Sequence, residues 1–125
     1  MTAPVRVLIV DDVPIVLTSL RRVLERAGFR VEAAESGGAA LAILGREEVD
    51  VVLSDFMMPG MNGIELLQAV RERWPRVRRA MLSAQADEEM LDKALKDGLL
   101  HGAFQKPWNN KELSDALRSL VAPVA

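Results

Sequence analysis

The hydrophobic and polar positions of the chain follow two alternating patterns. Short runs of consecutive apolar residues, which are typical of buried strands, recur along the chain, and each is followed by apolar residues at helical spacing. The expected strands cover residues 5–10, 29–34, 51–55, 78–82 and 102–105. The expected helices cover residues 13–27, 37–44, 62–74, 87–97 and 109–121, and Pro123 would end the domain.

This alternation predicts the α/β class, with a doubly wound five-stranded parallel sheet and helices on both faces. The expected strand order is the flavodoxin-like 2-1-3-4-5. Polar residues mark the helix starts, and Ser36 suits the N-cap of the second helix. Asn62 and Glu65 have the spacing of a capping box at the third helix. Asn109 and Glu112 have the same spacing at the fifth.

Length and composition narrow the class of protein. The 125 residues suffice for one domain with a core but not for two, so residues 1–125 are expected to form a single domain. No apolar stretch approaches the roughly 20 residues of a membrane span. Residues 1–4 lack the features of a signal peptide. A soluble cytoplasmic domain is therefore expected, with no membrane contact.

The net charge and the counts of cysteine and histidine exclude further classes of protein. A net charge of −2 and a pI near 5.4 argue against direct binding of nucleic acid. The absence of cysteine excludes disulfides and Cys-ligated zinc, and a single histidine, His101, argues against a histidine-rich metal site. One basic run is expected to be a solvated helix end and loop. It consists of Arg71, Arg73, Arg76, Arg78 and Arg79.

Five polar residues whose side chains can take part in binding or catalysis lie at or just beyond the ends of expected strands. They are Asp11, Asp12, Asp55, Ser83 and Lys106. Parallel strands place their carboxyl ends on one edge of the sheet, and strands one and three are neighbours, so the three acids should meet. At about 4 Å and an effective dielectric of about 20, one pair of carboxylates repels by roughly 4 kcal/mol. A shared proton or a bound cation must relieve this repulsion.

The residue types suit phosphoryl chemistry. Carboxylate oxygens favour a hard cation, and Mg²⁺ commonly takes one or two carboxylates and keeps a position for a phosphate oxygen. Lys106 can contact a carboxylate or a phosphoryl group as a point charge, and Ser83 supplies a hydroxyl donor. Together these groups form an electrostatic clamp for a transferring phosphoryl group. Asp55, the single acid after the central strand, is the candidate nucleophile, because carboxylates form acyl phosphates.

Each residue taken alone also has an ordinary structural explanation. The Asp11-Asp12 pair could cap the first helix, and Asp55 could belong to the turn chemistry of the Pro-Gly that follows it. Ser83 could be a turn residue and Lys106 a surface lysine. Their joint occurrence at the ends of four different strands favours the functional interpretation.

The same residues, in this order, resemble the receiver domain of two-component response regulators. The likeness covers the chain from Val5 to Val121. It rests on Asp11-Asp12, on residues 55–63 (DFMMPGMNG), on Ser83-Ala84 and on Lys106-Pro107. The stretch from residue 55 to 63 is the most specific of these motifs.

The resemblance implies a set of roles for the acids. Asp55 would accept a phosphoryl group from a phosphohistidine of a histidine kinase or phosphotransfer protein. Asp12 and Asp55 would bind Mg²⁺ together with the backbone carbonyl of Met57, and Asp11 would help through water. The chain would then be a signalling switch of a phosphorelay rather than an enzyme.

The resemblance also concerns the remaining site residues and the output. Ser83 and Lys106 would bind the phosphoryl oxygens, and the bond between Lys106 and Pro107 would be cis. Phosphorylation would change the surface of the fourth helix, fifth strand and fifth helix. That surface would bind a downstream output domain or effector protein, and it is a possible homodimer interface.

One position departs from the family pattern. Receiver domains usually carry an aromatic residue three places before the lysine, and here that place is Ala103, with Phe104 next to it. Adjacent residues of a strand face opposite sides, so Phe104 fills the usual space only if the strand slips or bulges by one residue. His101 and Trp108 are other candidates, although Trp108 is more simply explained as a hydrophobic staple of the fifth helix.

Three alternative functions have discriminating features. A Mg²⁺-dependent phosphohydrolase with an aspartyl nucleophile usually carries that residue on the first strand in an Asp-x-Asp motif, which differs from this chain. A phosphorylation-independent interaction module would retain the acids without binding Mg²⁺. A flavin mononucleotide carrier needs a hydroxyl- and glycine-rich loop after the first strand, where this chain has Asp11-Asp12-Val13-Pro14.

Overall fold

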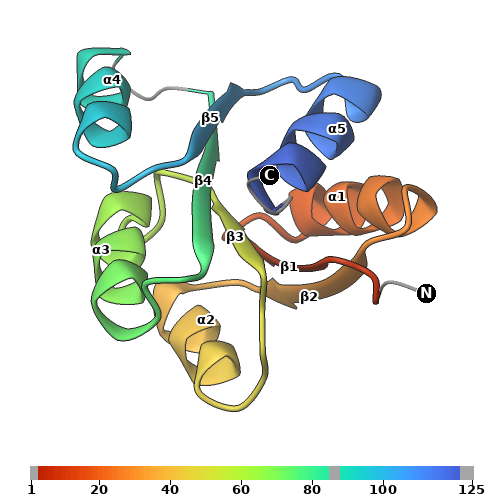
Figure 1. The fold of residues 1–125 in the computed structure, drawn as a ribbon, viewed down its shortest axis with the longest axis horizontal. Coiled ribbons are helices and arrows are strands. Elements are labelled where there is room, and N and C mark those ends of the chain that lie inside the picture. Colours follow the sequence, from red (N-terminus) through yellow and green to blue (C-terminus); the bar gives the residue numbers. More distant parts are fainter. Residues whose placement is uncertain (1–2, 85–87, 122–125) are drawn as a thin grey trace.

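The structure, a computed structural model, describes residues 3–84 and 88–121 and alternates between strand and helix (Figure 1). The strands are β1 (Arg6–Val10), β2 (Arg30–Ala34), β3 (Val51–Ser54), β4 (Arg78–Ser83) and β5 (Gly102–Gln105). The helices are α1 (Pro14–Arg26), α2 (Gly37–Leu44), α3 (Gly63–Arg73), α4 (Glu88–Lys96) and α5 (Asn110–Val121). The predicted helix start at Asp87 and the predicted end at Pro123 lie outside the described residues.

The five strands form one parallel sheet in the order β2-β1-β3-β4-β5, which confirms the prediction. From β1 the chain moves outward to β2, crosses back to β3 and then continues in the other direction. The order therefore reverses between β1 and β3. In open α/β sheets the crevice beyond the strand ends at such a reversal is where sites form.

Side chains of the central strands alternate between two hydrophobic cores. In β1, Val7 and Ile9 pack in the core beneath α1 and α5, whereas Leu8 and Val10 pack in the core beneath α2, α3 and α4. Figure 1 shows the same division, with α1 and α5 on one side of the sheet and the other helices opposite. Burial on both faces explains why these strands read as continuous apolar runs.

The predicted helix caps are largely confirmed. At α3, the Glu65 N–H donates to Asn62 Oδ1 (2.9 Å) and the Asn62 N–H donates to Glu65 Oε1 (3.1 Å), which completes the capping box. At α2, the Ala39 N–H donates to Ser36 Oγ (3.1 Å). None of the helices in the described ranges has the length and apolar character needed to cross a bilayer.

Candidate functional site

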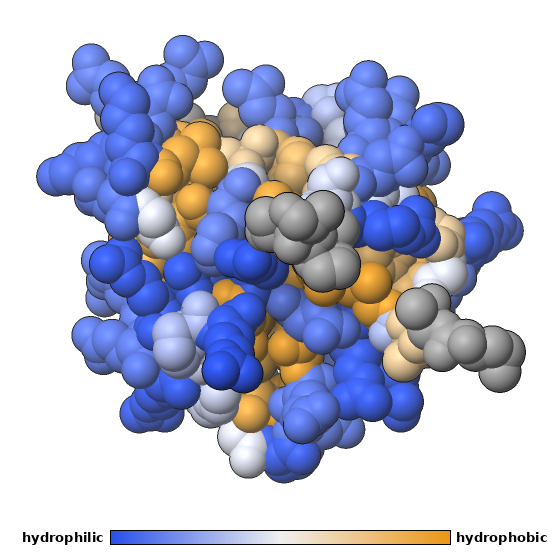
Figure 2. All heavy atoms as spheres, in the orientation of Figure 1, coloured by the Kyte–Doolittle hydropathy of each residue, from blue (hydrophilic) through white to orange (hydrophobic). Residues whose placement is uncertain are grey.

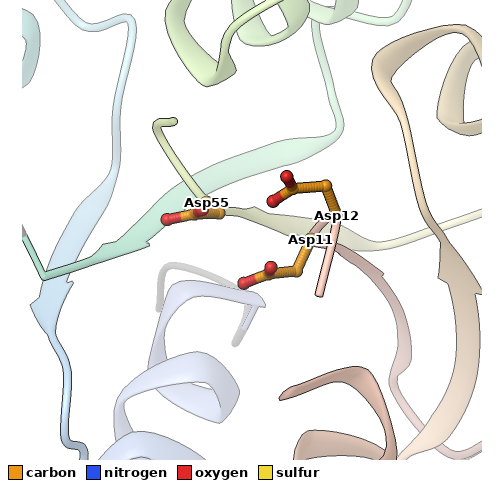
Figure 3. Close-up of side chains that lie close together, drawn as sticks. All are labelled: Asp11, Asp12 and Asp55. Carbon is orange, nitrogen blue, oxygen red and sulfur yellow. The ribbon is translucent and has the colours of Figure 1, made fainter. Parts of the chain in front are cut away.

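Backbone hydrogen bonds beyond β1 and β3 bring the acids together. The Asp11 N–H donates to the carbonyl of Ala34 (3.2 Å), and the Asp55 N–H donates to the carbonyl of Val10 (2.9 Å). The strand ladder thus extends one residue past each strand and sets Asp55 beside the end of β1. Figure 3 shows the side chains of Asp11, Asp12 and Asp55 gathered at this edge of the sheet.

The three carboxylates are close enough to share a cation. One oxygen from each of Asp11, Asp12 and Asp55 lies within 4.8 Å of the others. Asp11 is 2% exposed, while Asp12 and Asp55 are only partly buried. The acids that the sequence predicted to meet therefore do meet.

Lys106 joins two of these acids. Its Nζ lies 2.7 Å from Asp11 Oδ2 and 3.4 Å from Asp55 Oδ1. The other Asp11 oxygen, Oδ1, accepts the backbone N–H of Val13 (2.9 Å), just before α1 begins. Both oxygens of Asp11 are thus engaged by protein groups, which goes beyond the indirect role that the resemblance implied. Asp11 positions Lys106 and fixes the β1–α1 turn.

The pKa values of Asp55 and Lys106 are shifted by burial and by neighbouring charges. Burial raises the pKa of the Asp55 carboxyl; the positive charge of Lys106 opposes this shift, and the negative charge of Asp11 reinforces it. For Lys106, burial lowers the pKa, but the hydrogen bond and charge of Asp11, followed by the charge of Asp55, outweigh it and raise the pKa overall. The ammonium therefore stays charged against the acids at neutral pH.

A hollow of about 180 Å³ opens beside Asp55. It is lined by Asp55, Met57, Ser83, Ala84 and Lys106. Met57 stands at its rim with 58% of its surface exposed, and Ser83 is buried at the end of β4. The hollow thus contains the expected nucleophile, the hydroxyl and the ammonium in one place. Ala84 contributes only a methyl group to the lining, so it takes up little of the hollow.

Gly63 lies next to the site, and the sequence did not reveal why this position must be a glycine. A Cβ at this position would overlap the backbone carbonyl oxygen of Asp55 and approach Cα of Phe56 at 3.0 Å. The Gly63 N–H donates to the carbonyl of Phe56 (2.9 Å), which closes the loop after β3. The absence of a side chain therefore lets α3 begin directly against the backbone of Asp55.

The question about the aromatic residue of β5 is answered by the strand register. Residues of β4 and β5 pair without a break from Ala80–Gly102 to Ser83–Gln105, so there is no slip or bulge. Phe104 packs on the α1 and α5 side, where its ring lies near Leu120, whereas Ala103 packs on the opposite side. Phe104 therefore does not replace the missing aromatic residue. The Lys106–Pro107 bond is cis, as the resemblance implied.

The donor set fits the Mg²⁺ that the family resemblance implies. The three acids offer only oxygen ligands, which a hard divalent cation prefers. Repulsion between partly buried carboxylates is offset only in part by the ammonium of Lys106, because three negative charges face one positive charge. A divalent cation would complete the balance.

The prediction of a solvated basic run is wrong for Arg79. This residue lies in β4 with 4% of its surface exposed. Its Nε donates to the carbonyl of Leu99 (2.8 Å), its Nη1 to those of Val77 (2.9 Å) and Pro75 (3.3 Å), and its Nη2 to that of Gly98 (3.1 Å). These carbonyls follow the C-terminal ends of α3 and α4, where a helix dipole favours a cation.

His101 completes this second cluster. Its ring Nδ1 accepts the backbone N–H of Arg79 (2.9 Å), and the backbone N–H of His101 donates to the Arg79 carbonyl (2.7 Å). Burial, and then the charges of Arg79 and Arg78, lower the pKa of His101. The sequence signal for this arrangement was the position of Arg79 inside an apolar strand run, because a strand covered on both faces buries the side chains of both faces.

Comparisons with known proteins agree with this fold and site. The family model for the response regulator receiver domain matches residues 7–118. The hydrogenase transcriptional regulatory protein HoxA of Cupriavidus necator is 38% identical over 115 residues, 92% of this chain and 24% of that protein. Sporulation initiation phosphotransferase F of Bacillus subtilis is 32% identical, with 93% of each chain covered. The structure of chemotaxis protein CheY4 of Vibrio cholerae superposes with a TM-score of 0.86 at 32% identity, covering 94% of this chain and 99% of that one.

The chain therefore belongs to the response regulator receiver domain family, the signalling switches of two-component systems. It spans only part of some relatives, 24% of HoxA and 46% of the transcriptional regulatory protein TrcR of Mycobacterium tuberculosis. In those proteins the matching region is one part of a longer chain. The fold and family expected from the sequence are thus confirmed.

Proposed function

We propose that this chain is a phospho-accepting switch in which Asp55 receives the phosphoryl group. The observation that carries the proposal is the hollow that Asp55 shares with Ser83 and Lys106. Asp11 is less suited to this role, because it is buried and both of its oxygens already accept hydrogen bonds. Asp12 does not line the hollow. Asp55 is the acid that lines the hollow, and it lies beside the ammonium of Lys106.

In the proposed reaction, an oxygen of Asp55 attacks the phosphorus of a phosphohistidine on the donor protein. An O–P bond forms, the P–N bond breaks, and the electron pair stays on the imidazole nitrogen. The ammonium of Lys106, 3.4 Å from Asp55 Oδ1, compensates the negative charge that accumulates on the phosphoryl oxygens. Ser83, which also lines the hollow, supplies a hydroxyl donor. Such donors act most strongly where they are held in place before the reaction.

We further propose that Asp11, Asp12 and Asp55, with the backbone carbonyl of Met57, hold Mg²⁺. When bound, the ion would neutralise charge on the acids and on the incoming phosphoryl group. The role of this chain is to keep the three carboxylates within reach of one another. Asp11 does so from a fixed position, because Val13 and Lys106 hold its two oxygens.

Exposed apolar side chains around the site favour a protein donor. Val13, Ile15 and Met57 expose 43%, 73% and 58% of their surface, respectively. Two of them lie at the start of α1, directly after the acidic pair, and the third stands at the rim of the hollow. We propose that a histidine kinase or phosphotransfer protein covers this apolar rim while its phosphohistidine reaches Asp55.

The output surface is proposed to be the face of α4, β5 and α5. Ser83 ends β4 and Lys106 follows β5, so movement of either residue toward a phosphoryl group shifts these strand ends. Beside α4, a hollow of about 240 Å³ includes Leu91, Leu95 and Ala103 in its lining. Figure 2 shows hydrophobic surface next to α4. This face is suited to a downstream effector or output domain, or to a homodimer.

Incubation with acetyl phosphate and Mg²⁺ tests the proposal. The intact mass should rise by one phosphoryl group, and hydroxylamine should remove that group because an acyl phosphate is labile to it. Asp55→Asn should abolish the gain, whereas Asp97→Asn, an exposed acid after α4, should retain it. Phosphorylation that persists in Asp55→Asn would place the acceptor elsewhere. Steady turnover of phosphomonoesters would instead favour the phosphohydrolase.

A second measurement separates the switch from an interaction module that does not use phosphorylation. Titration of Mg²⁺ should give a calorimetric signal in the native chain, and Asp12→Asn should weaken it. Absence of Mg²⁺ binding would favour the module. The cytoplasmic location, the extent of a single domain over residues 1–125, and the absence of direct nucleic-acid or membrane contact stay predictions.

A further inference from the structure

Met57 places a thioether at the rim of the hollow beside Asp55. It follows Asp55 by two residues, lines the same hollow as Asp55 and Lys106, and has 58% of its surface exposed. A thioether sulfur is polarisable and is open to oxidation by peroxides, whereas aliphatic side chains are not. The exposure of Met57 therefore gives the rim of the site a reactivity that phosphoryl transfer does not use.

The other methionines that the structure describes are less exposed. Met58, the next residue along the chain, is 8% exposed, and Met81 is 1% exposed. Met61 and Met90 are half-buried. Because a peroxide must reach the sulfur before it can react, we expect Met57 to be oxidised first among these residues.

The composition of the chain leaves methionine as its sulfur chemistry. The chain contains six methionines and no cysteine, so no thiol of its own competes for an oxidant. A hydroperoxide that reaches the chain therefore meets thioether sulfur. The most exposed of the described thioethers belongs to Met57, which lines the same hollow as the acceptor acid.

Oxidation of Met57 would interfere with the ammonium of Lys106. An ammonium has three N–H donors, and the contacts with Asp11 and Asp55 take two of them. Among the described residues no further acceptor is seen for the third, which can therefore meet a phosphoryl oxygen. A sulfoxide carries a polar oxygen, and in a hollow of about 180 Å³ this oxygen would compete with the phosphoryl group for that donor.

We propose that Met57 is a modification site at which a hydroperoxide converts the thioether into a sulfoxide and thereby slows phosphorylation of Asp55. A sulfur lone pair attacks one oxygen of hydrogen peroxide, an S–O bond forms and the O–O bond breaks. The leaving hydroxide takes the proton of the transferred oxygen and departs as water. Sulfur is oxidised by two electrons and the peroxide is reduced by two. The effect on Asp55 rests on the proposed function, whereas the oxidation of Met57 does not.

Treatment of the full chain with hydrogen peroxide tests where oxidation occurs. Peptide mapping with fragmentation should find one added oxygen on Met57, formed roughly fivefold faster than on Met58. Met58 is the matched control, because it is the adjacent methionine and is buried. Met57→Leu should remove the fast phase of oxidation, and Met58→Leu should retain it.

Acetyl phosphate and Mg²⁺ then measure the consequence for Asp55. The oxidised native chain should be labelled about threefold more slowly than the untreated chain. Methionine sulfoxide reductases for both sulfoxide epimers should restore the rate. Each variant is compared with its own untreated sample, so a change in its basal rate does not affect the result. Peroxide should slow labelling of Met58→Leu as it does that of the native chain, and should not slow labelling of Met57→Leu.

Three results would overturn the proposal. The first is oxidation of Met57 and Met58 at comparable rates. The second is an unchanged labelling rate when Met57 is fully oxidised, and the third is equal slowing of the two leucine variants by peroxide. If the untreated chain takes up no phosphoryl group, the proposed function fails and the effect on Asp55 fails with it. Peptide mapping then still decides whether Met57 is the site of oxidation.

Discussion

Lys106 and Arg79 are both cations with little exposure, and they lie at opposite edges of the sheet. Lys106 follows β5 at the carboxyl edge and contacts the carboxylates of Asp11 and Asp55. Arg79 lies near the amino end of β4 and contacts four backbone carbonyls. The partners of Lys106 change charge when they bind a proton, a metal ion or a phosphoryl group. The carbonyls around Arg79 do not titrate.

This difference separates the part of the molecule that can switch from the part that stays fixed. An ion pair between Lys106 and acids gains or loses energy whenever the charge of the acids changes. The Arg79 cluster keeps constant hydrogen bonds at the ends of α3 and α4, and so holds the C-terminal end of α4 in place. We therefore expect substitutions at Arg79 to alter folding stability, and substitutions around Asp55 to alter the response to charge.

The largest effect is expected for Arg79→Met. Four carbonyl oxygens, of which those of Val77 and Leu99 are buried, would lose their donor, which should lower the free energy of unfolding by about 3 kcal/mol. Arg78→Met is the control, because Arg78 is only partly buried and its change should cost less than about 1 kcal/mol. Urea denaturation measures both. Equal costs for the two variants would show that Arg79 is no more important than its neighbour.

A smaller loss is expected at the acidic edge for Gly63→Ala. The added methyl group would overlap the carbonyl oxygen of Asp55, and relief of this overlap should cost about 2 kcal/mol of folding stability. It should also slow labelling by acetyl phosphate. Gly38→Ala, in α2, meets no atom within 4 Å and should be neutral or stabilising. A stable, fully active Gly63→Ala variant would contradict the close approach.

Asp55→Asn should raise stability in metal-free buffer. The pKa of Asp55 is raised in the fold, chiefly by burial, so the folded state binds its proton more tightly than the unfolded chain does. The resulting stability is present below the unfolded pKa of 3.8 and is lost as pH rises through the folded pKa. At pH 7 the variant avoids this loss, so its free energy of unfolding should be about 1 kcal/mol higher than that of the native chain.

The control for this stabilisation is Asp97→Asn, which removes an exposed acid. Chemical denaturation at neutral and acidic pH should show that the advantage of Asp55→Asn shrinks as Asp55 becomes protonated in the native chain. An Asp55→Asn variant that is less stable than the native chain at pH 7 would overturn the expectation.

The smallest effect concerns His101 in the Arg79 cluster. Its folded pKa is lowered, so the unfolded chain takes up a proton first and stability is lost as pH falls below the unfolded value of 6.5. Because the ring is partly exposed, the loss should stay below about 1 kcal/mol. His101→Gln should remove this pH dependence between pH 7.5 and 5.5. If urea denaturation shows that the stability of His101→Gln depends on pH as much as that of the native chain, the pH dependence comes from other groups.

Much of the fold follows from local patterns that need no tertiary information. Apolar runs and helical spacing predicted all five strands and all five helices, because burial on two faces makes a central strand continuously apolar. The capping box of Asn62 and Glu65 was also predictable, because both partners lie within one helical turn. The gathering of Asp11, Asp12 and Asp55 followed once the strands were taken as parallel.

Other features depend on contacts between residues far apart in the chain. The direct bond from Lys106 to Asp11 joins residues 95 positions apart, and the overlap that excludes a side chain at Gly63 involves the backbone of Asp55. The side on which Phe104 packs depended on the register of β5 against β4. A wrong prediction for Arg79 arose because charge suggests solvent, whereas the carbonyls that satisfy its donors come from two separate loops.

The sequence by itself therefore determined the strand order, the caps and the chemical types at the site, because these depend on periodicity and on near neighbours. Only the tertiary structure decided which acid is fully engaged and which arginine is buried. Such features depend on how distant backbones approach each other. A linear pattern of residues carries no direct measure of that distance.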